Sequence, residues 1–165
     1  VYKRQEIMRR WPNPCSLENA SPEELEAVLK PLGFYRFRAA ELVRIASALC
    51  RGEVGESTLA QLPGVGDYIS TAVLVHVYGK RLIAVDTNVS RVLARVLLGR
   101  EKLGRNELAA LKEALTPRGV SPRALNYALL DFGSLVCKRH NPQCSKCPAR
   151  KICKYFNGMV VKGPL

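Results

Sequence analysis

The stretch that decides the fold is LPGVGDY at Leu62–Tyr68, and Asp86 follows it 18 residues after Tyr68. The glycines of a Pro-Gly-Val-Gly turn accept positive φ angles and carry no Cβ, so successive N–H groups can point at one phosphate oxygen. The helix expected to begin near Asp67 adds the positive end of its dipole. We expect the hairpin to contact a phosphate, either directly or through a bound monovalent cation. The hairpin residues expected to do so are Leu62, Gly64, Val65 and Gly66. For this stretch alone, a glycine-rich turn that only joins two helices is the alternative.

The net charge points to a polyanionic partner. Twenty-six Lys and Arg against 14 Asp and Glu give the 165-residue chain a formal charge of +12 and a pI near 9.8. Such a balance is typical of proteins that bind nucleic acid. No apolar run approaches the roughly 20 residues of a membrane-spanning helix, and the N-terminal residues lack a signal-peptide core. The sequence therefore predicts a soluble, intracellular protein with no membrane partner.

Helical patterns dominate the chain, and no stretch shows a convincing strand-like alternation, so we expect an all-α fold. Start signals include the Ser-Pro pairs at residues 21–22 and 121–122, and stop signals include Gly52, Gly79 and Gly99. Between these signals, apolar residues recur at helical spacing. Helices are predicted over residues 22–31, 36–50, 57–61, 67–78, 87–98, 105–115 and 122–136.

Four of the six cysteines lie within 17 residues near the C-terminus. Their spacing is C-x6-C-x2-C-x5-C, through Cys137, Cys144, Cys147 and Cys153. Clustering of this kind favours a metal site over disulfides. Structural zinc suits four thiolates, but zinc motifs more often contain two close C-x2-C pairs, so we favour an iron–sulfur cluster. The isolated Cys15 and Cys50 are interpreted as ordinary packed thiols.

Two further stretches are candidates for contact with nucleic acid. Lys138 and Arg139 help to keep the cysteine loop basic, which fits phosphate contact, although a solvated charge run is the alternative. Residues 33–38 read GFYRFR and interleave aromatic with basic side chains. Phe34 and Tyr35 suit stacking on bases or wedging into an opened duplex. Core packing is the more frequent fate of a single aromatic residue.

Asp86 stands directly before an apolar helical stripe, and an ordinary helix N-cap is the simpler interpretation of it. The N-cap is compatible with a chemical role, because the helix dipole favours the charged carboxylate. An ionised carboxylate can stabilise an oxocarbenium-like sugar or activate water against it. Breaking a glycosidic bond makes the same electronic demand.

With the hairpin, Asp86 and the four cysteines in this order, the chain resembles the helix–hairpin–helix DNA glycosylases. The specific resemblance is to their iron–sulfur branch, which contains endonuclease III and the adenine glycosylases, and it spans nearly the whole chain. It implies a six-helix domain over residues 1–80 and a cluster domain over 81–165, with double-stranded DNA and a flipped base in the cleft between them. It also implies that Asp86 is the essential aspartate and that the four cysteines hold a 4Fe-4S cluster.

Position 68 divides this branch of the family. A lysine there, as in endonuclease III, attacks the sugar and leads to strand cleavage, whereas Tyr68 has no such amine. Tyrosine is similar to the archaeal thymine–guanine mismatch glycosylases, whose Gly-x-Tyr and Asp-x-Asn patterns have counterparts at residues 66–68 and 86–88. The resemblance thus implies a monomeric, prokaryotic, monofunctional enzyme that removes thymine and uracil opposite guanine in base excision repair.

The resemblance also implies roles for individual side chains. Asp86 is expected to stabilise the sugar cation, Tyr68 to hold the flipped base and Asn88 to support the site by hydrogen bonding. Arg91 is expected to anchor Asp86 or to contact a DNA phosphate. The alternatives are an adenine glycosylase that acts opposite guanine or 8-oxoguanine, and an inactive DNA-binding module. Family members carry helices before the point where this sequence begins, so the first domain is expected to be incomplete at its N-terminus.

Overall fold

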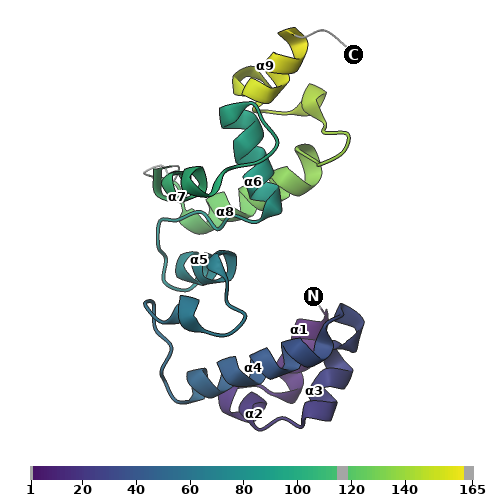
Figure 1. The fold of residues 1–165 in the computed structure, drawn as a ribbon, viewed down its shortest axis with the longest axis vertical. Coiled ribbons are helices and arrows are strands. Elements are labelled where there is room, and N and C mark those ends of the chain that lie inside the picture. Colours follow the sequence, from purple (N-terminus) through teal and green to yellow (C-terminus); the bar gives the residue numbers. More distant parts are fainter. Residues whose placement is uncertain (1, 115–118, 162–165) are drawn as a thin grey trace. The chain divides into compact units, whose positions relative to one another are not determined.

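The computed structural model of the chain describes residues 2–114 and 119–161. Every element in these two ranges is helical, which confirms the predicted all-α class (Figure 1). The chain divides into two compact units, Val1–Gly66 and Asp67–Leu165. The domain boundary expected near residue 80 concerns the two domains of the family and stays a prediction. Over the described ranges, no helix has the length and apolar character needed to cross a membrane.

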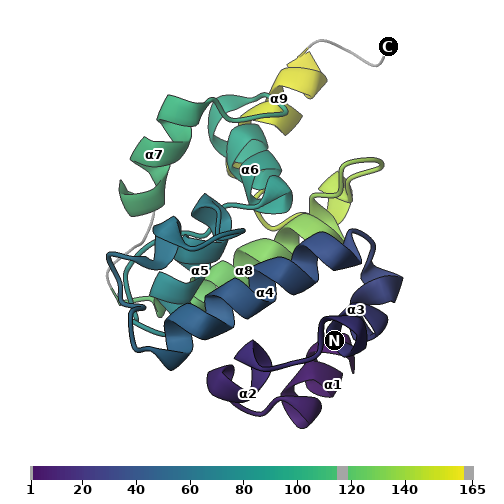
Figure 2. The ribbon, with the colours of Figure 1, turned by 60° about the horizontal axis from the view of Figure 1, so that its bottom comes forward.

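The first unit packs short helices against a long one. The elements are α1 (Tyr2–Arg10), α2 (Pro14–Glu18), α3 (Pro22–Leu29), the 3-10 turn η1 (Lys30–Leu32), α4 (Tyr35–Cys50) and the 3-10 turn η2 (Leu59–Gln61). α2 and α3 both lie against α4, and α1 contacts α3 (Figure 2). The core consists of Leu25, Leu29 and Ala39, with partly buried Ile7, Trp11, Leu17, Tyr35, Leu42 and Val43 around it.

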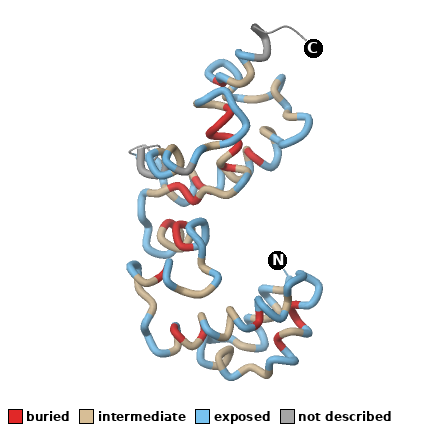
Figure 3. Tube along the Cα trace, in the orientation of Figure 1, coloured by how far each residue is buried: buried red, intermediate tan, exposed pale blue. Residues whose placement is uncertain are grey.

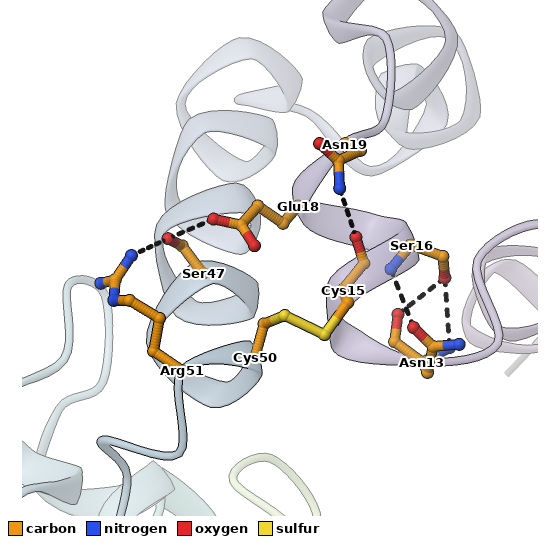
Figure 4. Close-up of a disulfide and its surroundings, with 8 residues drawn as sticks. All are labelled: Asn13, Cys15, Ser16, Glu18, Asn19, Ser47, Cys50 and Arg51. Atoms are coloured by element: carbon orange, nitrogen blue, oxygen red, sulfur yellow. Dashed lines mark hydrogen bonds between the residues drawn. A yellow bond between two sulfur atoms is a disulfide. The ribbon is translucent and has the colours of Figure 1, made fainter.

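A disulfide between Cys15 on α2 and Cys50 on α4 joins two of these helices (Figure 4). The interpretation of these cysteines as packed thiols was therefore wrong. The Cα atoms lie 4.9 Å apart, because the packing of α2 on α4 brings the two residues together. Beside the disulfide, Ser47 donates to Glu18 at 2.6 Å, which adds a polar bond between the same two helices.

The second unit is built around the helix that follows Asp86. Its elements are α5 (Asp67–His76), α6 (Thr87–Leu93), the π-helical η3 (Ala94–Leu98), α7 (Arg105–Ala114), α8 (Pro122–Asp131), the π-helical η4 (Phe132–Val136), the 3-10 turns η5 (Cys144–Lys146) and η6 (Arg150–Ile152), and α9 (Lys154–Val161). Buried residues are concentrated along α6 and the segment before it (Figure 3). The core consists of Ile83, Val89 and Leu93, with Val85, Leu97, Leu103, Leu125, Leu129 and Leu130 packed against it.

The predicted helices differ from the observed ones mainly in their last turns. The helices expected to reach residues 98 and 136 change from α to π winding at Ala94 and Phe132. Ser21 precedes α3 as predicted, but its hydroxyl donates to Glu23 instead of capping the helix. Residue 115, the expected end of α7, lies outside the described residues. The sequence patterns did not reveal α1, α2 or α9.

Candidate functional site

The hairpin residues form a tight turn in the first unit. Val65 N–H donates to the Leu62 carbonyl at 3.1 Å, and Gly64 has a φ of 73°. Pro63 and Gly64 thus occupy the second and third positions that a type II turn prefers. A Cβ added at Gly64 would lie 2.5 Å from the Glu41 carboxylate on α4, so that side chain would have to move. The turn uses the Val65 amide for its own closure, so that amide is already engaged.

Asp86 caps α6 in the second unit and is half-buried. One carboxylate oxygen, Oδ1, accepts the N–H of Val89 at 2.7 Å. The other, Oδ2, accepts Nδ2 of Asn88 at 3.1 Å, so the hydrogen bond expected from Asn88 is present. Two donors on different residues fix the plane of the carboxylate. An ionised carboxylate offers about four acceptor sites, so capacity remains for a substrate or a water.

Arg91 is buried and supports Asn88 from the opposite side. Its Nη2 donates to Oδ1 of Asn88 at 3.0 Å and to the Gly133 carbonyl at 2.7 Å, and its Nε donates to the Cys137 carbonyl at 2.8 Å. Only 9% of the residue is exposed, so the structure does not support the DNA contact expected of it. These bonds connect Arg91 to Asp86 through Asn88, and they join α6 to η4.

Gly133 allows this close packing. A Cβ built at position 133 would lie 2.8 Å from Cβ of Asn88 and 3.3 Å from its backbone carbonyl. Both contacts involve atoms that cannot swing away, so a side chain at Gly133 would push η4 off α6. The position of Asn88, and through it the Asp86 carboxylate, therefore depends on a glycine 45 residues further along the chain.

A large open pocket lies beside Asp86 within the second unit. Its volume is about 850 Å³. Most side chains in its wall are polar or charged: Asp86, Thr87, Ser90, Arg91, Glu101, Lys102, Arg139 and His140. Arg139 and His140 are exposed and line the same pocket as the Asp86 carboxylate. Nothing in the sequence context of His140, an isolated histidine, indicates that it borders this pocket.

All four clustered cysteines line a second cavity in the same unit. Burial raises the pKa of the Cys144 thiol, and the charges of Cys147, Cys137 and Cys153 raise it further. Within the described ranges, no group of three or more His, Cys, Asp or Glu side chains converges as the ligands of a metal ion would. The rest of the cavity wall consists of aliphatic, aromatic and arginine side chains and Gln143. The cavity thus brings together four thiols, which is the donor set of a four-thiolate site, without the side chains converging as bound ligands would.

Arg95 connects the cysteine cavity to the basic loop. Its side chain is only 4% exposed, and its guanidinium donates to the carbonyls of Lys138 at 2.7 Å and Arg139 at 3.2 Å and lies 3.7 Å from Sγ of Cys137. Glu101 neutralises it in an ion pair at 2.9 Å. Although partial burial raises the pKa of Glu101, hydrogen bonds with Tyr155 and Arg95 outweigh that effect and lower the pKa below its usual 4.5. Arg95 thus fixes the backbone of the loop that carries Lys138 and Arg139, the two candidate phosphate-binding side chains.

The two aromatic candidates of the first unit, Phe34 and Tyr35, differ in exposure. Phe34 is 84% exposed and adopts a left-handed conformation, with φ 48° and ψ 30°, just before α4. Tyr35 is half-buried and packs against the core of Leu25, Leu29 and Ala39. The exposed ring of Phe34 is therefore the one available to stack on a base. Tyr68, at the first turn of α5, is 39% exposed.

The chain is similar in sequence to two archaeal proteins that are both named as thymine-excising DNA glycosylases. The chain is 34% identical to the thymine-DNA glycosylase of Aeropyrum pernix over an alignment of 163 residues. The alignment covers 93% of this chain and 73% of the relative. The chain is 36% identical over 167 residues to the thymine/uracil-DNA glycosylase of Pyrobaculum aerophilum, covering 94% of this chain and 72% of the relative.

Solved structures agree with these relatives. The structure of a thermostable thymine-DNA glycosylase matches with a TM-score of 0.86 and 28% identity, covering 96% of this chain and 76% of that one. A non-covalent endonuclease III–DNA complex matches with a TM-score of 0.82 and 26% identity, covering 98% and 77%. The family described as HhH-GPD superfamily base excision DNA repair protein matches residues 3–118. The helical fold, the hairpin and the capped aspartate accord with this match, and the chain belongs to the HhH-GPD superfamily of base excision DNA repair proteins.

Proposed function

We propose that the chain is a monofunctional DNA glycosylase that removes thymine and uracil opposite guanine. The observation that carries the proposal is the Asp86 carboxylate, which is oriented by Val89 and Asn88 and borders an open pocket. Tyr68 stands where endonuclease III has its lysine, so the chain lacks an amine that could attack the sugar there. Relatives named for thymine and uracil support the choice of base.

The proposed reaction is hydrolysis of the N-glycosidic bond. The bond between C1′ and the base nitrogen breaks, and the departing base takes the electron pair and then a proton. Asp86 stabilises the positive charge that develops on the sugar and accepts a proton from the attacking water, whose oxygen forms the new bond to C1′. Flipping the base out of the duplex costs a few kcal/mol, and a wobble mispair lowers that cost.

Positioning of Asp86 falls to its neighbours. Asn88 holds one carboxylate oxygen, and Arg91 holds Asn88 against Gly133 and Cys137. Both side chains are therefore proposed to act through Asp86. Tyr68 is proposed to contact the flipped base.

DNA would be held at three exposed places. The turn formed by Leu62, Gly64, Val65 and Gly66 is proposed to approach a phosphate, with or without a monovalent cation. Phe34 is proposed to wedge into the duplex, and Tyr35 to support it from the core. Lys138 and Arg139 are proposed to contact the backbone near the pocket. Phosphate contacts of this kind fix position and carry no sequence information.

The four cysteines are proposed to hold a 4Fe-4S cluster. When bound, such a cluster would tie η4, η5 and the residue before α9 together through four thiolate bonds. Iron analysis and a broad absorbance near roughly 400 nm test this directly, because zinc gives no such band. A colourless protein containing one zinc ion would refute the assignment.

A panel of duplexes tests the function. Incubation with T·G, U·G and A·G duplexes should give abasic sites in the first two, and cleavage of A·G alone would identify an adenine glycosylase instead. Asp86→Asn should lower the single-turnover rate by about a thousandfold, because the group that stabilises the charge is neutralised. An unchanged rate would refute the catalytic role, and an inactive parent that binds DNA would indicate a binding module. Borohydride should trap no covalent adduct, since no lysine stands at position 68.

A further inference from the structure

Asn126 lies in the middle of α8, 40 residues beyond Asp86 in the chain, and is only 2% exposed. Its Oδ1 accepts the N–H of Ala84 at 2.8 Å, and its Nδ2 donates to the Leu82 carbonyl at 2.9 Å and to the Pro122 carbonyl at 2.8 Å. The Pro122 bond stays within α8. The other two reach a separate segment, which leads directly to Asp86.

That segment, residues 81–86, has no helical or strand conformation of its own. Buried backbone N–H and C=O groups need partners, and in a strand a neighbouring chain would supply them. Here the amide of Asn126 takes the place of that neighbour by bonding both a donor and an acceptor of the segment. Between these two contacts, Ile83 is 1% exposed and packs in the core beside Val89 and Leu93. The segment is therefore clamped by a polar bond on each side of an apolar anchor.

We propose that Asn126 is a positioning residue for Asp86. Only Val85 separates the clamped Ala84 from Asp86, so the bond at Ala84 sets where the carboxylate enters the first turn of α6. Arg91 and Asn88 hold the carboxylate from the α6 side, and Asn126 holds it from the side at which the chain arrives. That Asn126 affects catalysis rests on the proposed function. That Asn126 holds the segment before Asp86 rests on its hydrogen bonds to Ala84 and Leu82.

Asn126→Ala tests the proposal. Excision from a T·G duplex, measured under single turnover well below the melting temperature, should slow by at least about tenfold. The Kd for a duplex carrying a non-cleavable thymidine analogue opposite guanine should stay within about twofold, because no DNA contact is assigned to Asn126. Leu129→Ala is the matched control, since it weakens the same core from the same helix but removes no hydrogen bond to residues 81–86. The control should lower Tm and leave the rate within about twofold of the parent.

A second measurement reads the position of Asp86 without any activity. Hydrogen exchange at the Val89 amide reports its bond to Asp86, and exchange at Ala84 reports the clamp. Both should accelerate in Asn126→Ala, whereas Leu129→Ala should leave Val89 protected. If Asn126→Ala does not fold, Asn126→Asp replaces it: the carboxylate can still accept from Ala84 but, when ionised, no longer donates to Leu82.

The outcomes separate the two proposals. A parental rate in the position-126 variant, or a Val89 amide that exchanges no faster than in Leu129→Ala, would overturn the role of Asn126. Equal rate losses in both variants at equal loss of Tm would do the same. If the parent cleaves none of the duplexes, the proposed function fails, while the exchange comparison still decides whether Asn126 holds Asp86.

Discussion

Phe34 combines an unfavourable backbone conformation with an exposed aromatic ring. Its φ of 48° lies in the left-handed region, which costs a residue with a Cβ about 1 kcal/mol or more. Its ring is 84% exposed, so no core contact compensates for that cost. Strain of this kind is often retained where a side chain has a function outside the fold. The proposed wedge into DNA gives the ring such a function.

Replacing Phe34 by glycine and by alanine separates strain from binding. Phe34→Gly should be more stable than Phe34→Ala by up to about 1 kcal/mol, because only glycine relieves the positive φ. Both variants should bind a T·G duplex less tightly than the parent by about 1–3 kcal/mol, the range for loss of one aromatic stack. Chemical denaturation and fluorescence anisotropy measure the two effects. Parental affinity in both variants would remove Phe34 from the DNA interface.

Arg91 lies at the centre of the hydrogen bonds that position the carboxylate. Arg91→Met should lower the free energy of unfolding by about 2–4 kcal/mol, because it leaves buried acceptors on Gly133 and Cys137 without their donor. Excision should slow as well, since Asn88 loses its support. Arg123→Met on the exposed face of α8 is the control and should change stability by less than about 0.5 kcal/mol. An Arg91 variant with parental stability would contradict the hydrogen bonds observed.

At the scale of elements, the disulfide is the only covalent link between helices in the described residues. It closes a separation of 35 residues, for which chain entropy gives a stabilisation of roughly 3–4 kcal/mol. The double variant Cys15→Ser/Cys50→Ser should therefore melt at a lower temperature than the parent, and the first unit should lose its protection from hydrogen exchange first. Serine variants are preferable to a reductant, which would also act on the clustered thiols. Identical melting of parent and variant would show that the bridge contributes nothing in solution.

Sequence patterns were sufficient for the elements that have local signals. The Ser-Pro starts, the glycine stops and the apolar spacing located α3, α4, α5, α6, α7 and α8, and the Asp86 cap followed from one polar residue before an apolar stripe. α1 and α2 are short and polar and bury no residue completely, so no apolar stripe marks them. The disulfide and the Asn126 clamp join residues far apart in the chain, and only tertiary packing brings them together.

At the scale of the whole molecule, the formal charge of +12 predicts a strongly salt-dependent affinity for DNA. Each phosphate neutralised contributes a slope of about −0.9 to the plot of log binding constant against log salt concentration. The double variant Lys138→Ala/Arg139→Ala should reduce the magnitude of the slope by about 2, because two phosphate contacts disappear. Arg9→Ala, on α1 and outside every stretch expected to contact DNA, should leave the slope unchanged. A control that changes the slope as much as the double variant would point to a diffuse charge effect.

The two π-helical turns, η3 and η4, make the chain sensitive to the deletion of single residues. In each π-helical turn, one main-chain carbonyl accepts a hydrogen bond from a side chain outside the turn. The Gly133 carbonyl of η4 accepts from Arg91, and the Arg95 carbonyl of η3 accepts from the thiol of Cys153. Removing one residue from η4 would restore α winding and reclaim that carbonyl. Because such a deletion would take the Gly133 carbonyl from Arg91, positions of η4 other than Gly133 should tolerate substitution far better than the chain tolerates the loss of a single residue there.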